Sequence, residues 1–373
     1  MNFTFHTPTQ IHFGCDKFNE TGKLVKHLGN RCLIVTGKTS MQKHGYLDRI
    51  KEILKKEKIE TFFFTNISND AKSSEVNKGA SVCRQEEIDF IIALGGGSSI
   101  DGAKAISVSY DLEKIEPFIG TQLKQDKKSL PLVAIPTTAG TGSEVTKGAI
   151  ITDDIKNFKS GVRGEQIFPK IAIIDPKLSL TMPDNVAATT GFDTFTHLFE
   201  SYLAKKSNKF TDMISIAGLE LIMTALPESL KSPADISLRE KISYAALLGG
   251  INVGNASTCL PHRLQQAMGS VPSIHQPHAQ GLAALYPSWS ARIYNFKKEK
   301  IENLKNFIGQ KSKSISFIDK FIENIGVKNK LSDYGVKKDH LDIFIKNISG
   351  NLDNDPIEQK NNQLFKEIYL ESL

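Results

Sequence analysis

The sequence lacks the features that mark small secreted domains and membrane proteins. Its 373 residues include only four cysteines, Cys15, Cys32, Cys83 and Cys259, which form no CxxC pair, and a chain of this size needs no disulfide framework. No apolar run approaches the roughly 20 residues of a membrane-spanning helix. The N-terminus lacks the basic start and apolar centre of a signal peptide. We therefore expect a protein of the reducing cytoplasm that does not contact a membrane.

Positive charge is only slightly in excess, with a formal net charge of +6. The lysines lie mostly in helix-like stretches such as Lys51–Lys58 and Lys297–Lys305, where glutamates and apolar residues are interleaved with them. This mixture is typical of solvated helix faces rather than of a surface that binds nucleic acid. We therefore expect no nucleic-acid partner.

The chain is long enough for two domains, because single hydrophobic cores stop growing at about 250–300 residues. Its first half alternates apolar strands with helices, which predicts a parallel sheet with crossover helices. The predicted strands are Arg31–Thr36, Thr61–Thr65, Asp89–Leu94, Pro131–Pro136 and Ile171–Ile174, and the helices are Tyr46–Lys58, Ser73–Gln85 and Ile100–Ser109. In the second half, helices are predicted at Val186–Ala204, Asp212–Glu228, Leu238–Asn255, Ala279–Tyr294 and Gln359–Leu373. We divide the chain into an α/β domain of residues 1–182 and an all-helical domain of residues 183–373.

Two loops rich in small residues follow strands of the predicted sheet. The first is Gly95-Gly96-Gly97-Ser98-Ser99, and the second runs from Thr137 to Glu144. Glycines let backbone N–H groups approach a pyrophosphate closely, and hydroxyls can hydrogen-bond phosphate or a nicotinamide carboxamide. Either loop by itself could be a polar turn without a ligand. Together, at one edge of a parallel sheet, they indicate a nucleotide site, although the glycine pattern is not GxGxxG.

A carboxylate and several histidines in the helical half provide donors that divalent metals prefer. Asp193 and His197 are four residues apart in a predicted helix, so their side chains lie on one face. His262, His275 and His278 follow further along the chain. One carboxylate with imidazoles suits Fe²⁺ or Zn²⁺. The alternative is that these are ordinary structural or exposed histidines.

These motifs, in this order, resemble the iron-containing alcohol dehydrogenase family. The matching segments are DFIIALGGGSSID (89–101), PTTAGTGSEVT (136–146), Asp175-Pro176, Pro183, GFDTFTHLFE (191–200), Asn255, His262 and Pro277-His278 with Pro287. The segments are long and ordered, and the resemblance extends from the first strand to the C-terminal helix.

The resemblance implies a dehydroquinate synthase-like fold, with a dinucleotide-binding α/β domain followed by a helical domain that holds a divalent metal, Fe²⁺ or Zn²⁺. The metal ligands, which also form the catalytic centre, would be Asp193, His197, His262 and His278. The residues implied for binding NAD or NADP are Gly37, Gly95, Gly96, Gly97, Ser98, Thr137, Thr138, Thr141 and Lys159. We expect a homo-oligomer, a dimer, that acts on a small alcohol or aldehyde.

The sequence departs from the family's pattern in ways that bear on the chemistry. Gln266 stands where the family usually has a second histidine, and glutamine does not relay protons by titrating; His275 is a candidate substitute. The stretch from His262 to His278 is longer than usual. After the first strand, Lys38 lies where many NAD-specific members have an aspartate nearby, so NADP use stays open.

The expected reaction is hydride transfer between a primary alcohol, or its aldehyde in reverse, and NAD(P), with the metal as Lewis acid. The segment from Thr258 to Gln266 is similar to a branch that oxidises the terminal hydroxyl of an acidic sugar, the 3-deoxy-manno-octulosonate 8-oxidase type. Arg263 would suit a carboxylate substrate. The alternatives are a glycerol dehydrogenase-like or dehydroquinate synthase-like enzyme, against which the segment 137–146 argues, and a non-catalytic homologue that binds nucleotide or a partner protein.

Overall fold

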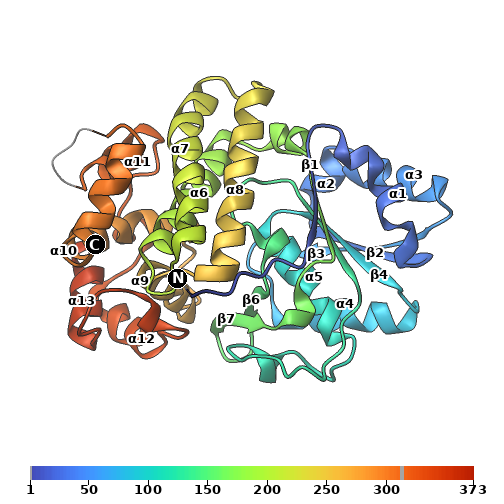
Figure 1. Ribbon diagram of the computed structural model, residues 1–373. Helices are drawn as coiled ribbons and strands as arrows, with labels where there is room; N and C mark the ends of the chain where they lie inside the picture. The colour runs from blue at the N-terminus through green and yellow to red at the C-terminus, as the bar shows by residue number, and fades with distance from the viewer. Residues whose placement is uncertain (1, 311–314) are drawn as a thin grey trace. The chain divides into compact units, whose positions relative to one another are not determined.

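The chain forms two compact units (Figure 1). The computed structural model describes residues 2–310 and 315–373. One unit is Thr7–Met182, and the other is Pro183–Leu373 together with the segment that ends at His6. The sequence did not indicate that the first residues belong with the helical unit. They do so because Phe5 packs edge-on against Phe210, with ring centroids 4.6 Å apart.

The α/β unit is built on a six-stranded parallel sheet in the order β1-β8-β5-β4-β2-β3. The strands are β1 (Gln10–Phe13), β2 (Arg31–Gly37), β3 (Glu60–Ile67), β4 (Phe90–Gly95), β5 (Leu132–Pro136) and β8 (Ile171–Ile174). The predicted parallel sheet is therefore confirmed. The order β3-β2-β4-β5-β8 is that of a doubly wound sheet whose winding reverses between β2 and β4, and nucleotides bind beyond the carboxyl ends of the strands at such a point.

Both faces of this sheet are covered, because alternate residues of each strand enter two separate hydrophobic cores. Ile34 of β2 faces the core that contains Ile50 of α3 (Tyr46–Lys56). Leu33 faces the other core, which contains Val76 of α4 (Ser73–Gln85) and Ile106 of α5 (Gly97–Ser109). Figure 1 shows α3 and α4 on opposite sides of β2 and β4. This burial on both faces explains why the strands read as continuous apolar runs.

Three strands of the α/β unit were not predicted. Strand β1 extends the edge of the sheet, and β6 (Gly148–Asp153) and β7 (Phe158–Arg163) form an antiparallel hairpin. Helix α5 begins at Gly97, earlier than the predicted Ile100. Part of the glycine run is therefore the first turn of a helix, where backbone N–H groups lack intrahelical partners.

The second unit is helical, as predicted. Its α-helices are α6 (Asp184–Leu203), α7 (Lys209–Lys231), α8 (Ile236–Ala256), α9 (Leu260–Ala267), α10 (His278–Phe307), α11 (Phe317–Asn324), α12 (Leu341–Lys346) and α13 (Asn362–Glu371). Phe192, Phe195 and Phe199 recur at helical spacing on α6, and their rings contact Tyr286 of α10. This fully buried aromatic cluster holds α6 against α10.

Helix α7 is the one helix of the described residues that is long and apolar enough to cross a membrane by length and composition. Its buried residues include Ser215, Leu219, Ile222 and Leu226, which recur every three or four positions. This face packs against α6 and α8, which lie beside α7 in Figure 1. Only 39% of its most apolar window is buried, so this packing accounts for part of its apolar composition, and a single helix of this kind is weak evidence for a membrane span.

Candidate metal centre and cofactor loops

One carboxylate oxygen and three imidazole nitrogens converge inside the helical unit. Oδ1 of Asp193 lies 3.6 Å from Nε2 of His197, 3.7 Å from Nε2 of His262 and 3.5 Å from Nε2 of His278. The ligand atoms of Asp193, His262 and His278 all lie within 4.8 Å of one another. His197 contacts the same oxygen, and its ring stacks on His262 with centroids 4.9 Å apart. All three histidines that the resemblance implied as ligands therefore approach the Asp193 carboxylate, and the group whose ligand atoms all lie close to one another consists of Asp193, His262 and His278 without His197.

The dimensions of this cluster fit a metal ion. Metal–donor bonds of about 2.1 Å in tetrahedral geometry separate neighbouring donors by about 3.4 Å, close to the distances from Asp193 Oδ1. Oδ1 of Asp193 and Nε2 of His262 are buried, and neither has a hydrogen-bond partner among the described residues. Buried polar atoms that point at one another without hydrogen bonds are costly unless something binds them. The donor set and its spacing therefore suit a divalent cation.

The electrostatics of the cluster favour a charged carboxylate. Burial alone would raise the pKa of Asp193, but the neighbouring His197, His278 and His262 hold it well below its usual value. Burial opposes a charge on His262, yet Glu200 and Asp193 raise the pKa of its imidazole to about 9. A cation at this place competes with a proton for His262 and supplies the same positive charge.

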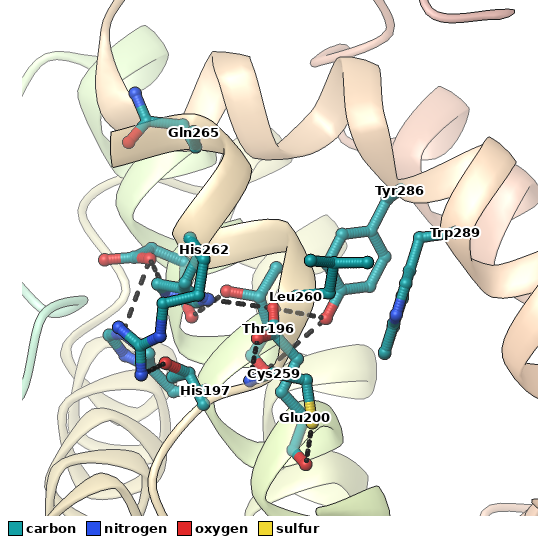
Figure 2. Close-up of polar contacts among 12 residues, drawn as sticks. Thr196, His197, Glu200, Cys259, Leu260, His262, Gln265, Tyr286 and Trp289 are labelled. Carbon is teal, nitrogen blue, oxygen red and sulfur yellow. Dashed lines mark hydrogen bonds and ion pairs between the residues drawn. The ribbon is translucent and has the colours of Figure 1, made fainter. Parts of the chain in front are cut away.

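Glu200 fixes the orientation of His262. It lies on α6 one turn beyond His197, is fully buried, and its Oε1 accepts a hydrogen bond from Nδ1 of His262 at 2.8 Å. Figure 2 shows Glu200 and Tyr286 beside His262, and the Tyr286 hydroxyl donates to the same Oε1 at 3.3 Å. Because a carboxylate only accepts, Nδ1 carries a hydrogen in either protonation state, and Nε2 is the ring nitrogen left for a cation to bind in place of a proton.

The start of α9 is held by carboxylates from distant parts of the chain. Cys259 precedes the helix without a side-chain cap, and its backbone N–H donates to Oε2 of Glu200 at 2.6 Å. The next N–H, of Leu260, donates to Oδ2 of Asp355 at 2.9 Å, and the Trp289 indole donates to the same oxygen at 2.9 Å. Negative charge at a helix N-terminus is favourable. These contacts place the first turn of α9, and with it His262.

Gln266 and Arg263, the two residues of α9 that the sequence analysis discussed beside His262, have different surroundings. Gln266 lies one turn after His262, is 7% exposed, and its Oε1 has no hydrogen-bond partner among the described residues. The guanidinium of Arg263 is buried and donates to the hydroxyls of Ser257 and Thr258 at 3.3 and 3.1 Å. Arg263 therefore secures the connection into α9. His275 is exposed and lies outside the cluster of ligand atoms.

In the α/β unit, the two predicted cofactor loops pack directly on each other. They follow the adjacent strands β4 and β5, and the backbone N–H of Thr137 donates to Gly95 O at 3.0 Å. A Cβ at Gly97 would lie 2.4 Å from Cγ2 of Thr141, and one at Gly96 would lie 3.3 Å from Oγ1 of Thr138. Gly95 has a φ of +153°. The glycines are therefore required for the close approach of the loops as well as for any approach of a phosphate.

The remaining predicted cofactor residues lie around these loops. Gly37 ends β2, the strand next to β4, so it lies at the same edge of the sheet. Ser98 donates its hydroxyl hydrogen to the carbonyl of Asn69. Lys159 on β7 forms an ion pair with Asp70, with Nζ and Oδ1 2.6 Å apart. The contacts of Ser98 and Lys159 place both residues beside the segment that follows β3.

A buried lysine that the sequence analysis did not single out braces the second loop. Lys104 on α5 is fully buried, and its Nζ donates to Ser143 Oγ, Thr146 Oγ1 and Gly148 O at 2.8, 3.0 and 3.0 Å. Burial lowers the pKa of Lys104 to about 8, and burial raises the pKa of the nearby Glu144 to about 7. The glycine-rich helix and the threonine-rich loop are therefore joined by one polar network.

Comparison with known proteins assigns these sites to a family. The sequence matches the iron-containing alcohol dehydrogenase family over residues 8–176 and the C-terminal region of the Fe-containing alcohol dehydrogenase family over residues 187–372. The chain belongs to the iron-containing alcohol dehydrogenase family. It is therefore an oxidoreductase of the alcohol dehydrogenase type, in a family that depends on a metal and on NAD(P).

Individual relatives match nearly the whole chain. It is 30% identical over 359 residues to the probable NADH-dependent butanol dehydrogenase 1 of Bacillus subtilis (strain 168), with 92% of each chain covered. It is 32% identical over 361 residues to choline dehydrogenase of the same organism, covering 92% of this chain and 88% of the relative. The crystal structure of an iron-containing alcohol dehydrogenase from Thermotoga maritima has a TM-score of 0.87 at 29% identity, covering 100% of this chain and 99% of that one.

Proposed function

We propose that this iron-containing alcohol dehydrogenase interconverts a primary alcohol and its aldehyde with NAD(P), at a divalent metal held by Asp193, His197, His262 and His278. The observation that carries the proposal is the convergence of one carboxylate oxygen and three Nε2 atoms at distances of 3.5 to 3.7 Å. The donor spacing and the buried atoms without hydrogen bonds support a resident cation at this place.

The chemistry follows from what each group supplies. A divalent cation supplies Lewis acidity, which lowers the pKa of an alcohol hydroxyl toward neutrality. NAD(P) supplies the hydride acceptor at its nicotinamide ring. Asp193 balances the positive charge, and Glu200 keeps the Nε2 lone pair of His262 available through the 2.8 Å hydrogen bond to Nδ1. The proposed cofactor residues are the two packed loops, with Gly37 and Lys159.

The polar surroundings of the centre favour a substrate with hydroxyl groups beyond the reacting one. Gln266 lies on the same face of α9 as His262, and a buried amide oxygen without a partner is satisfied by a donor such as a sugar hydroxyl. A sugar acid such as 3-deoxy-manno-octulosonate, oxidised at its terminal hydroxyl, carries such additional hydroxyl groups. Arg263 does not favour the acidic group specifically, because its guanidinium is buried against Ser257 and Thr258.

An anaerobic assay tests the proposal. The metal-free protein is supplied with Fe²⁺ or Zn²⁺ and assayed with NAD⁺ or NADP⁺ against butanol, choline, glycerol and acidic sugars. We expect turnover that requires the metal and is lost in His262→Ala. Full activity of that variant without metal would contradict the proposal, and a higher kcat/KM for butanol than for every polyol would contradict the substrate class.

The proposal extends to the compartment and the oligomeric state. The four cysteines are all free, three of them buried, which suits a reducing compartment such as the cytoplasm. A homodimer follows from the expectation for the family. Light scattering on the purified protein measures the oligomeric state, and a monomeric mass would contradict it.

A further inference from the structure

His278, the most exposed of the proposed metal ligands, is held by the side chain of Gln265. The side chain of His278 is 32% exposed, whereas those of His197 and His262 are 8% and 4% exposed. His278 is also the first residue of α10, where the chain enters the helix without a side-chain cap. Its orientation therefore depends on whatever contacts the ring itself.

Gln265 makes that contact. It lies on α9 three residues after His262, is 4% exposed, and its Oε1 is hydrogen-bonded to Nδ1 of His278. An amide oxygen only accepts, so Nδ1 carries the hydrogen and the lone pair of Nε2 faces Asp193. The opposite orientation of the amide would donate to Nδ1, place the hydrogen on Nε2 and block the ligand atom. One short helix therefore supplies one ligand and orients another.

Gly281 leaves the space that Gln265 occupies. A Cβ at Gly281, one turn after His278 on α10, would lie 2.8 Å from Cγ of Gln265 and 3.0 Å from Oε1 of Gln276. The first distance is too short for any real contact and involves the middle of the side chain, so an added methyl group would displace Gln265. Glycine in a helix interior costs about 1 kcal/mol relative to alanine, and this contact gives a reason for it.

We propose that Gln265 is a positioning residue that sets the tautomer and the direction of His278 toward the metal, and that Gly281 is required for Gln265 to reach it. The proposal rests on the proposed metal centre and goes beyond it, because it assigns affinity for the ion to two residues that do not touch it. Loss of a hydrogen-bonding partner behind a metal-bound histidine typically weakens metal binding by about 10- to 100-fold.

The test is the dissociation constant for Zn²⁺, measured by titrating metal-free protein in competition with a chelator. Gln265→Met keeps the size of the side chain and removes the acceptor, so affinity should fall about 10- to 100-fold. Gln265→Glu keeps an acceptor and should bind within a few-fold of the wild type. Gln363→Met, at an exposed glutamine of α13, is the matched control and should not change the affinity.

Gly281→Ala tests the same contact independently, because it displaces the side chain of Gln265 without changing its amide group. It should weaken binding to a similar extent, and the double variant with Gln265→Met should be no weaker than the worse single variant, because both changes break the same contact. Equal affinity of the wild type and Gln265→Met, or additive losses in the double variant, would overturn the assignment while leaving the metal centre intact. A wild-type protein that binds no ion would overturn both proposals.

Discussion

Replacing Glu200 with glutamine tests how strongly the hydrogen bonds around the proposed metal centre determine its affinity for the ion. In the wild type, Oε1 accepts from His262 Nδ1 at 2.8 Å and Oε2 accepts from the Cys259 N–H at 2.6 Å. Glutamine offers one acceptor oxygen and one donor group of the same size. If the amide nitrogen faces Cys259, two buried donors oppose each other. If it faces His262, the hydrogen of the imidazole moves to Nε2, the atom that would bind the ion.

Either arrangement weakens metal binding. A buried donor without an acceptor costs about 1–3 kcal/mol, and substitutions behind metal-bound histidines reduce affinity by about 10- to 100-fold, which corresponds to about 1.4–2.7 kcal/mol. We therefore expect the dissociation constant of Glu200→Gln for Zn²⁺ to rise by this factor. Competition with a chelator measures it, and circular dichroism checks that the helical content is unchanged.

Glu220→Gln is the matched control, because Glu220 is exposed on α7 and carries the same chemical change. We expect the control to bind the ion like the wild type. If Glu200→Gln bound Zn²⁺ as tightly as the wild type and the control, the hydrogen bond to His262 would have no part in holding the metal.

Three further predictions concern the cofactor, the pH dependence of stability and the substrate. Lys38→Asp introduces a carboxylate after β2, where the resemblance implies the ribose of the cofactor, and should lower kcat/KM for NADP⁺ about tenfold relative to NAD⁺; equal changes for both cofactors would refute it. Burial raises the pKa of Glu144 to about 7, so its contribution to stability is complete below the ordinary glutamate pKa of about 4.3 and is lost as the pH rises through 7. Urea unfolding should therefore show a decline of up to about 3 kcal/mol over this window that is absent in Glu144→Gln; parallel pH profiles would argue against it. Gln266→Leu should lower kcat/KM for polyols while leaving butanol nearly unchanged, measured in the same spectrophotometric assay; an equal loss for both would show that Gln266 does not contact the substrate.

Much of the α/β unit could be predicted because its strands are buried on both faces. The strand Ile171–Ile174 and the helix Ser73–Gln85 have the bounds that periodicity and composition indicated. The hairpin of β6 and β7 was missed although β6 alternates between partly buried and buried positions, because β7 does not alternate and contains lysine, serine and glycine, of which glycine and lysine are uncommon in strands. Helix α9 was missed because its eight residues are fewer than the window of about 11 over which helical periodicity is recognised.

The residues around the metal centre could be predicted only in part. Asp193 and His197 share a helix face, and the spacing of four residues carries that information. The partners Glu200 and Asp355 are separated from the residues they hold by long stretches of sequence, so no local pattern relates them. Glu200 alone had a usable signal, because it lies seven residues after Asp193 on the same helix face. Gln265 could not be found without knowing that α9 and α10 lie side by side.

The most direct test is an anomalous diffraction map from crystals of the protein loaded with Zn²⁺. A single ion should lie about 2.0–2.2 Å from the Asp193 carboxylate and from Nε2 of His197, His262 and His278. An ion bound elsewhere, or no ion at these four residues at saturating Zn²⁺, would contradict the account.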